Sequence, residues 1–112
     1  MATISSHVLD SVRGTHAAGI RCQLLQLSPN GDREVVFDVL ADHEGRIHET
    51  VPVGDDDVGG EYELLLHAAE YFQAETALVP VVVIRFIVHD AARRYHLPVM
   101  LSPHSYSTWW SA

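Results

Sequence analysis

The stretch Ile20-Arg21-Cys22-Gln23-Leu24 alternates apolar and polar side chains. This two-residue period is typical of a β-strand with one face in water. The alternation slips by one residue just afterwards, and a β-bulge near Leu24-Leu25 accounts for the slip. The turn signal Ser28-Pro29-Asn30-Gly31-Asp32 follows, and Glu34 to Leu40 is a plausible return strand. The stretch therefore predicts an antiparallel pair of strands.

The same β character recurs along most of the chain. His67 to Glu75 breaks it, with alanines and aromatic residues that suit a short helix. We expect about eight strands and one short helix in a single domain, residues 1–112, folded as an all-β sandwich. The pattern alone does not separate an immunoglobulin-like sandwich from other sandwiches. The further strands are expected over Thr3 to Leu9, from Arg46 onward, Glu61 to Leu66, Val79 to Val88, Arg93 to Leu101 and Ser105 to Trp110.

The charge balance limits the possible partners. The formal net charge is −8, and all seven cationic side chains are arginines. Such an acidic chain argues against binding to nucleic acid, whose phosphates need basic neutralisation, and against anionic membranes. No apolar run reaches the ~18 to 20 residues of a membrane span. No charged-then-apolar leader opens the chain, so a cytoplasmic location is the expectation.

Neither the cysteine nor the acidic loop predicts a special site. Cys22 stands alone, so no internal disulfide can form, and its place in the alternation indicates a small buried apolar residue. Asp55-Asp56-Asp57 forms an exposed acidic loop without the glycine and distal glutamate of a calcium-binding EF-hand. The eight histidines include no tight zinc motif such as His-Glu-x-x-His. We therefore expect no metal and no cofactor.

Two histidines and one arginine are the candidates for chemistry. His7 and His96 each lie in a strand-like stretch beside apolar residues, and Arg46 follows a tight turn that ends at Gly45. Alone, such a histidine is more often a hydrogen-bonded core or interface residue, and such an arginine is often a surface residue. The remaining histidines have ordinary surface interpretations: His16, His43, His48, His67, His89 and His104.

Three motifs change that weighting: His7-Val8-Leu9-Asp10, Gly45-Arg46 and Tyr95-His96-Leu97-Pro98. Together they resemble the transthyretin-like 5-hydroxyisourate hydrolases, enzymes of urate breakdown in purine metabolism, from about Ile4 to Ala112. The resemblance implies a transthyretin-like (prealbumin-like) β-sandwich that assembles as a homotetramer. It also implies active sites where two subunits meet, and it places His7, Arg46 and His96 on the catalytic residues of the family.

The implied activity is that of a cyclic amide hydrolase, in which water opens the lactam ring of 5-hydroxyisourate or a close relative. A neutral histidine, with an ordinary pKa of about 6.5, suits the general base that activates this water. An arginine can stabilise the charge that develops on the carbonyl oxygen. The sequence leaves open which histidine is the base. The reaction needs no metal, organic cofactor or covalent nucleophile.

The end of the chain departs from the family pattern. The usual Tyr-Arg-Gly-Ser ending is replaced here by Trp109-Trp110-Ser111-Ala112. The resemblance implies that C-terminal residues line the substrate channel against a second copy; the candidates for substrate binding are Ser107, Thr108, Trp109, Trp110 and Ala112. Three interpretations follow: the family reaction with a rebuilt pocket wall, hydrolysis of another planar heterocycle that stacks on an indole, or a non-catalytic binder of a small aromatic ligand. The retained His7, Arg46 and His96 favour the first two.

Overall fold

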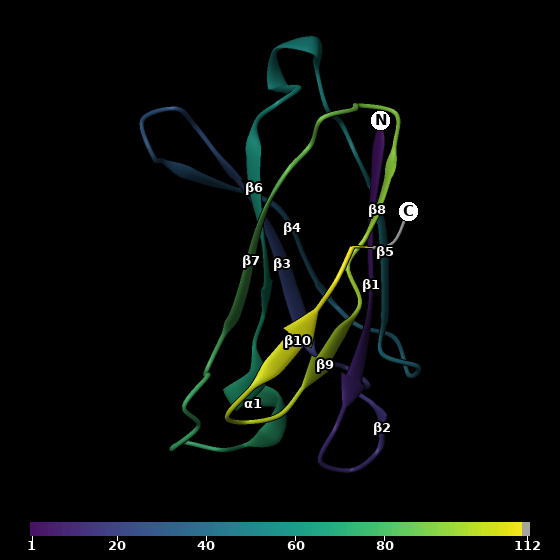
Figure 1. The fold of residues 1–112 in the computed structure, drawn as a ribbon, viewed down its shortest axis with the longest axis vertical. Coiled ribbons are helices and arrows are strands. Elements are labelled where there is room, and N and C mark those ends of the chain that lie inside the picture. Colours follow the sequence, from purple (N-terminus) through teal and green to yellow (C-terminus); the bar gives the residue numbers. More distant parts are fainter. Residues whose placement is uncertain (111–112) are drawn as a thin grey trace.

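The structure, a computed structural model that describes residues 1–110, is a sandwich of two β-sheets (Figure 1). The all-β prediction is confirmed, and α1 (Ala68–Phe72) is the short helix expected between residues 67 and 75. One sheet contains β1 (Ala2–Asp10), β2 (Thr15–His16), β5 (Arg46–Val51), β8 (Arg94–His96), β9 (Val99–Leu101) and β10 (Tyr106–Thr108). The other, in the order β4-β3-β6-β7, contains β3 (Arg21–Leu27), β4 (Arg33–Leu40), β6 (Glu61–Leu66) and β7 (Val82–Ile87). A short 3₁₀ helix, η1 (Asp55–Asp57), precedes β6.

The apolar faces of the two sheets form the core. Ile4 and Val8 of β1 are fully buried, as are Cys22 and Leu24 of β3. The prediction for Cys22 is confirmed, because its side chain is 0% exposed and burial raises the pKa of its thiol to about 12. The predicted bulge is also confirmed, since the register between β3 and β4 shifts between Leu24 and Leu25.

Strand β1 organises the six-stranded sheet. It pairs along most of its length with β5, antiparallel, and on its other side with β8 and then β9, both parallel. The single strand predicted over residues 93–101 is therefore wrong: it is two strands separated by Leu97-Pro98. Proline has no N–H to donate to a ladder, so pairing is interrupted there. Leu97 still holds the chain to β1, because its N–H donates to the Ser5 carbonyl at 2.9 Å.

A buried carboxylate fixes the end of β1 to the helix. Asp10 is 1% exposed, and it accepts hydrogen bonds from the N–H groups of Val12 and Arg13 and from the Tyr71 hydroxyl of α1. Burial alone would raise the pKa of Asp10, but these hydrogen bonds outweigh it and lower the pKa. None of the helices within residues 1–110 is long and apolar enough to cross a membrane.

Candidate active site

His7, Arg46 and His96 lie on one face of the six-stranded sheet. His7 of β1 is directly opposite Arg46 of β5, and Ser5, two residues before His7, is directly opposite His96 of β8. Paired residues of neighbouring strands point to the same face, as do residues i and i+2 of one strand. The alternate residues of β1, including Ile4, point into the core. The three candidates therefore gather on the outer face of the sheet, although the chain separates them widely.

The turn before β5 determines where Arg46 lies. Gly45 has a φ of 73°, and a Cβ at this position would lie 2.4 Å from the Val8 carbonyl oxygen. Its own carbonyl accepts a hydrogen bond from the Val8 N–H at 2.8 Å. The Asp42 carboxylate accepts a hydrogen bond from the Arg46 N–H at 2.9 Å. Only glycine tolerates this conformation together with this close approach. The turn therefore places Arg46 directly opposite His7.

His96 is held through Ser5. Its Nδ1 lies 2.8 Å from the Ser5 hydroxyl oxygen, which also accepts a hydrogen bond from Arg94 Nε at 3.4 Å. We assign the serine proton to the hydrogen bond with His96 Nδ1, which places the proton of the neutral imidazole on Nε2. Burial lowers the pKa of His96, and the charges of Arg94, His7 and Arg46 lower it further. The lowered pKa favours the neutral ring, which in this tautomer presents an N–H donor at Nε2.

In His7 the two ring nitrogens have the reverse roles, with the proton on Nδ1 and the lone pair on Nε2. Burial lowers its pKa, the charges of Arg46 and His16 lower it further, and a backbone hydrogen bond to Glu44 raises it. A backbone group that raises the pKa of a histidine accepts a proton, so it is a carbonyl. Because His7 Nε2 faces His16 Nδ1 at 3.1 Å, we assign the proton of neutral His7 to Nδ1. Neutral His7 thus keeps a lone pair on Nε2, as a general base requires.

The residues near the C-terminus divide between the two faces. Ser107 is opposite Met100, which is opposite Leu9 of β1, so Ser107 shares the face of His7. Thr108 is opposite the buried Val99 and faces the other way. Its hydroxyl donates a hydrogen bond to the Pro98 carbonyl at 2.8 Å.

Trp109 and Trp110 are 50% and 54% exposed. The guanidinium of Arg93 lies 4.6 Å from the centroid of the Trp110 ring, within the range of a cation–π contact. This contact holds the indole beside the start of β8. Ala112, the last candidate, lies outside the described residues.

Sequence reasoning missed three polar residues beside the trio: Ser5, His16 and Arg94. His16 was expected to be an ordinary surface residue; instead it is half-buried and contacts His7. Its strand β2 has only two residues, opposite the end of β1, too few to show a period. The turn signal at Gly14 could have indicated that the chain doubles back there. Ser5 and Arg94 lie two residues before His7 and His96 in the predicted strands, but only the alignment of β8 with β1 brings them together.

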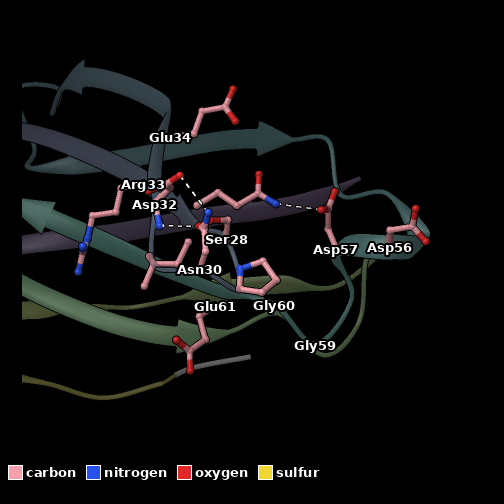
Figure 2. Close-up of a pocket in the computed structure, with 13 residues that line it drawn as sticks. Ser28, Asn30, Asp32, Arg33, Glu34, Asp56, Asp57, Gly59, Gly60 and Glu61 are labelled. Atoms are coloured by element: carbon pink, nitrogen blue, oxygen red, sulfur yellow. Dashed lines mark hydrogen bonds between the residues drawn. The ribbon is translucent and has the colours of Figure 1, made fainter.

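A prominent hollow lies away from the three candidates (Figure 2). It is a cleft of ≈ 960 Å³ at one end of the four-stranded sheet, where the β3–β4 turn meets η1 and the start of β6. Gln26 donates a hydrogen bond to Asp57 across its lining at 2.9 Å. His7, Arg46 and His96 do not line it. Within residues 1–110, no group of three or more histidine, cysteine, aspartate or glutamate side chains is arranged to hold a metal ion.

Comparison with known proteins agrees with the fold and the motifs. The profile of the HIUase/Transthyretin family matches residues 4–110. A 5-hydroxyisourate hydrolase of Pseudomonas aeruginosa is 35% identical over 97% of this chain and 90% of its own length. One of Deinococcus radiodurans is 37% identical over 95% and 92%. The crystal structure of an (S)-allantoin synthase superposes with a TM-score of 0.82 at 26% identity, over 99% of this chain but 44% of that one. The chain belongs to the HIUase/transthyretin family.

Proposed function

We propose that this protein hydrolyses 5-hydroxyisourate, with His7, Arg46 and His96 as its catalytic residues. The observation that carries the proposal is the register of β1, which brings the three residues to one face of the sheet. Relatives that share about a third of its residues over nearly the whole chain bear the name of this enzyme. The alternative of a non-catalytic binder of aromatic ligands is not favoured.

The arrangement of protons assigns the two histidines different roles. His7 Nε2 takes a proton from water as the water oxygen attacks the lactam carbonyl carbon. Negative charge develops on the carbonyl oxygen, where Arg46 and the Nε2–H of His96 stabilise it. The C–N bond then breaks, and protonated His7 returns its proton to the departing nitrogen. His7 ends neutral, so the cycle consumes one water molecule and needs no further reactant.

Both lowered pKa values fit these roles. A base must be neutral at working pH to accept a proton, and a neutral imidazole donor stabilises an oxyanion without adding a cation that repels Arg46. Burial is the largest cause of the lowered pKa in each case, and Arg46 contributes to both. The same arginine therefore stabilises the transition state and adds to the lowering of the pKa of both histidines, of which burial is the larger cause.

The test is the decay of freshly generated 5-hydroxyisourate, followed by its near-ultraviolet absorbance. The protein should accelerate the decay. His7→Ala, Arg46→Ala and His96→Ala should each reduce the acceleration by roughly 100- to 1000-fold, the usual effect of removing a positioned catalytic group. His89→Ala, at an exposed histidine in a loop, is the matched control and should leave the rate unchanged. If the unmodified protein gives no acceleration, the proposal fails.

We also propose a homotetramer in which Ser107, Trp109 and Trp110 line a channel shared with a second copy. Within residues 1–110, β7 and β10 each end a sheet, and β7 exposes Val83 and Ile87 at 44% and 40%. An unpaired edge with apolar residues is suited to pairing with another chain. Light scattering after size exclusion should give four times the mass of the chain. A stable monomer with solvent-exposed tryptophan fluorescence would contradict the shared channel.

The proposal includes a cytoplasmic location. The single thiol, buried at Cys22, fits a reducing compartment, where disulfides are rare. Cell fractionation of the native host should recover the protein with soluble cytoplasmic markers, and recovery with a secreted or membrane fraction would contradict this part of the proposal.

A further inference from the structure

The imidazole of His16 contacts the proposed base. Strand β2 runs antiparallel to the end of β1 and pairs His16 with Leu9, two residues beyond His7. His16 Nδ1 lies 3.1 Å from His7 Nε2, and the ring centroids are 5.2 Å apart with a tilt of 33°. The reaction described above uses Nε2 of His7 but gives no role to His16.

We assign the direction of this hydrogen bond from the surroundings of His7 on its other side. With the proton of neutral His7 assigned to Nδ1, on the side of the Glu44 backbone, Nε2 is an acceptor. In this assignment His16 Nδ1 carries the proton and donates it to His7 Nε2, 3.1 Å away. The lone pair that takes a proton from water is therefore the one to which His16 donates.

We propose that His16 is a positioning residue that sets the pH range over which His7 is available as a base; the inference rests on the proposed function for the role of His7. A donor on the lone pair makes Nε2 less basic, and a protonated His16 would place a second charge beside it. The attacking water takes the place of His16 Nδ1 at this lone pair when substrate is bound. His16 thus keeps His7 uncharged until water replaces it.

The other groups that face His7 have opposite effects on its protonation. Arg46 of β5 opposes its protonation, and Glu44 in the turn before β5 favours it through both its carbonyl and its carboxylate. His96 of β8 interacts with His7 through charge. Each His16 variant keeps these groups in its sequence, so we assign a change in the titration of His7 to the loss of His16.

His16 can be replaced without opening the core. Its side chain lies at a shallow hollow of ≈ 350 Å³ that Leu9, Gly14 and Met100 also line. None of these three residues belongs to the buried hydrophobic core, and the buried Asp10 that also lines the hollow keeps its own hydrogen bonds to Val12, Arg13 and Tyr71. Variants at position 16 should therefore fold, and their thermal unfolding should stay close to that of the unmodified protein.

The experiment compares His16→Asn and His16→Ala with the unmodified protein, with His89→Asn as the matched control. Asparagine can place an amide donor near the position of Nδ1 but carries no charge, whereas alanine removes both donor and charge. The titration of the His7 ring is followed by NMR without substrate, and kcat/KM for 5-hydroxyisourate is measured across pH. The midpoint for His7 should rise in the order unmodified, His16→Asn, His16→Ala, by about half to one pH unit in total. The acid limb of kcat/KM should move to higher pH by the same amounts.

The two measurements separate the two proposals. If His7 titrates identically in all four proteins, His16 does not act on His7 and the inference is overturned. A loss of rate at every pH with an unmoved midpoint would also overturn it, since that result indicates only a structural role. If the unmodified protein does not hydrolyse 5-hydroxyisourate but the His7 midpoint moves as expected, the proposed function is wrong. The effect of His16 on the titration of His7 is then still supported.

Discussion

His7 and Arg46 are directly opposite each other on β1 and β5, the last of six consecutive residue pairs between these strands. The pairing places a permanent cation beside a neutral imidazole on the outer face of the sheet. It depends on the turn 42–45, which ends at the glycine whose carbonyl bonds to β1. The catalytic proposal therefore depends on a backbone relationship, and several substitutions test it.

Replacing Arg46 with lysine tests whether charge alone is enough. Lysine keeps the positive charge but loses the planar fork of donors that matches a carbonyl or carboxylate. We expect Arg46→Lys to lower kcat roughly 10- to 100-fold and Arg46→Ala roughly 100- to 1000-fold. The matched control is Arg21→Lys, because Arg21 pairs with Asp38 on the other sheet. Equal rates for Arg46→Lys and the unmodified protein would show that the fork is not used.

The pH profile should respond to Arg94. Burial lowers the pKa of His96 most, and the Arg94 charge is the next cause. Arg94→Gln should therefore raise the pKa of His96, so that His96 becomes protonated at a higher pH and the acid limb of the rate profile moves upward. NMR titration of the His96 ring would measure the shift directly. Arg21→Gln removes the same charge far from the site and should leave both curves in place.

Gly45→Ala should reduce both stability and activity. A positive φ costs a non-glycine residue about 1 to 3 kcal/mol, and the new Cβ would also meet the Val8 carbonyl oxygen at 2.4 Å. The clash has to push β5 away from β1 and move Arg46 away from His7. Gly31→Ala is the matched control, since Gly31 has a φ of 90° but open space around its Cβ position. Thermal unfolding and kcat should show a larger loss of stability for Gly45→Ala, and a loss of activity for that variant alone.

The strands with the clearest period were predictable from the sequence. The alternation from Ile20 predicted β3, and the slip at Leu24-Leu25 predicted its bulge. The turn at Gly45 predicted that Arg46 begins β5. These features are local, because a strand shows its period and a turn its glycine within a few residues. The break at Leu97-Pro98 was missed, although the proline was visible, because apolar residues on both sides suggested one strand.

The neighbourhood of the site was harder to predict than its members. A family resemblance identified His7, Arg46 and His96, but no local pattern places His16 against His7 or Arg94 against Ser5. Those contacts depend on how three strands align with β1. The apolar–polar period of one strand does not determine its alignment with a strand that is distant in the sequence. Thr108 shows the same limit: adjacent to Ser107 in sequence, it faces the opposite side of the sheet.

The unusual ending gives the last prediction. Trp110 lies under the guanidinium of Arg93 and is more than half exposed in the single chain, so its indole is available to a planar substrate in the proposed shared channel. Stacking on an aromatic face contributes roughly 0.5 to 1.5 kcal/mol beyond burial. Trp110→Arg should therefore raise KM for 5-hydroxyisourate by about three- to tenfold and change kcat little. The new arginine would also lie beside Arg93, and their repulsion would move it away from the position that the indole holds.

Trp109→Tyr is the control for Trp110→Arg, because tyrosine keeps an aromatic face and should change KM by less. Steady-state kinetics of both variants, with light scattering to verify their assembly, would measure the difference. Replacing the ending with Tyr-Arg-Gly-Ser at positions 109–112 extends the test, and we expect it to resemble Trp110→Arg. If that replacement instead increases kcat/KM on 5-hydroxyisourate, the two tryptophans serve a different, more apolar heterocycle. The stacking role proposed here for Trp110 would then be wrong.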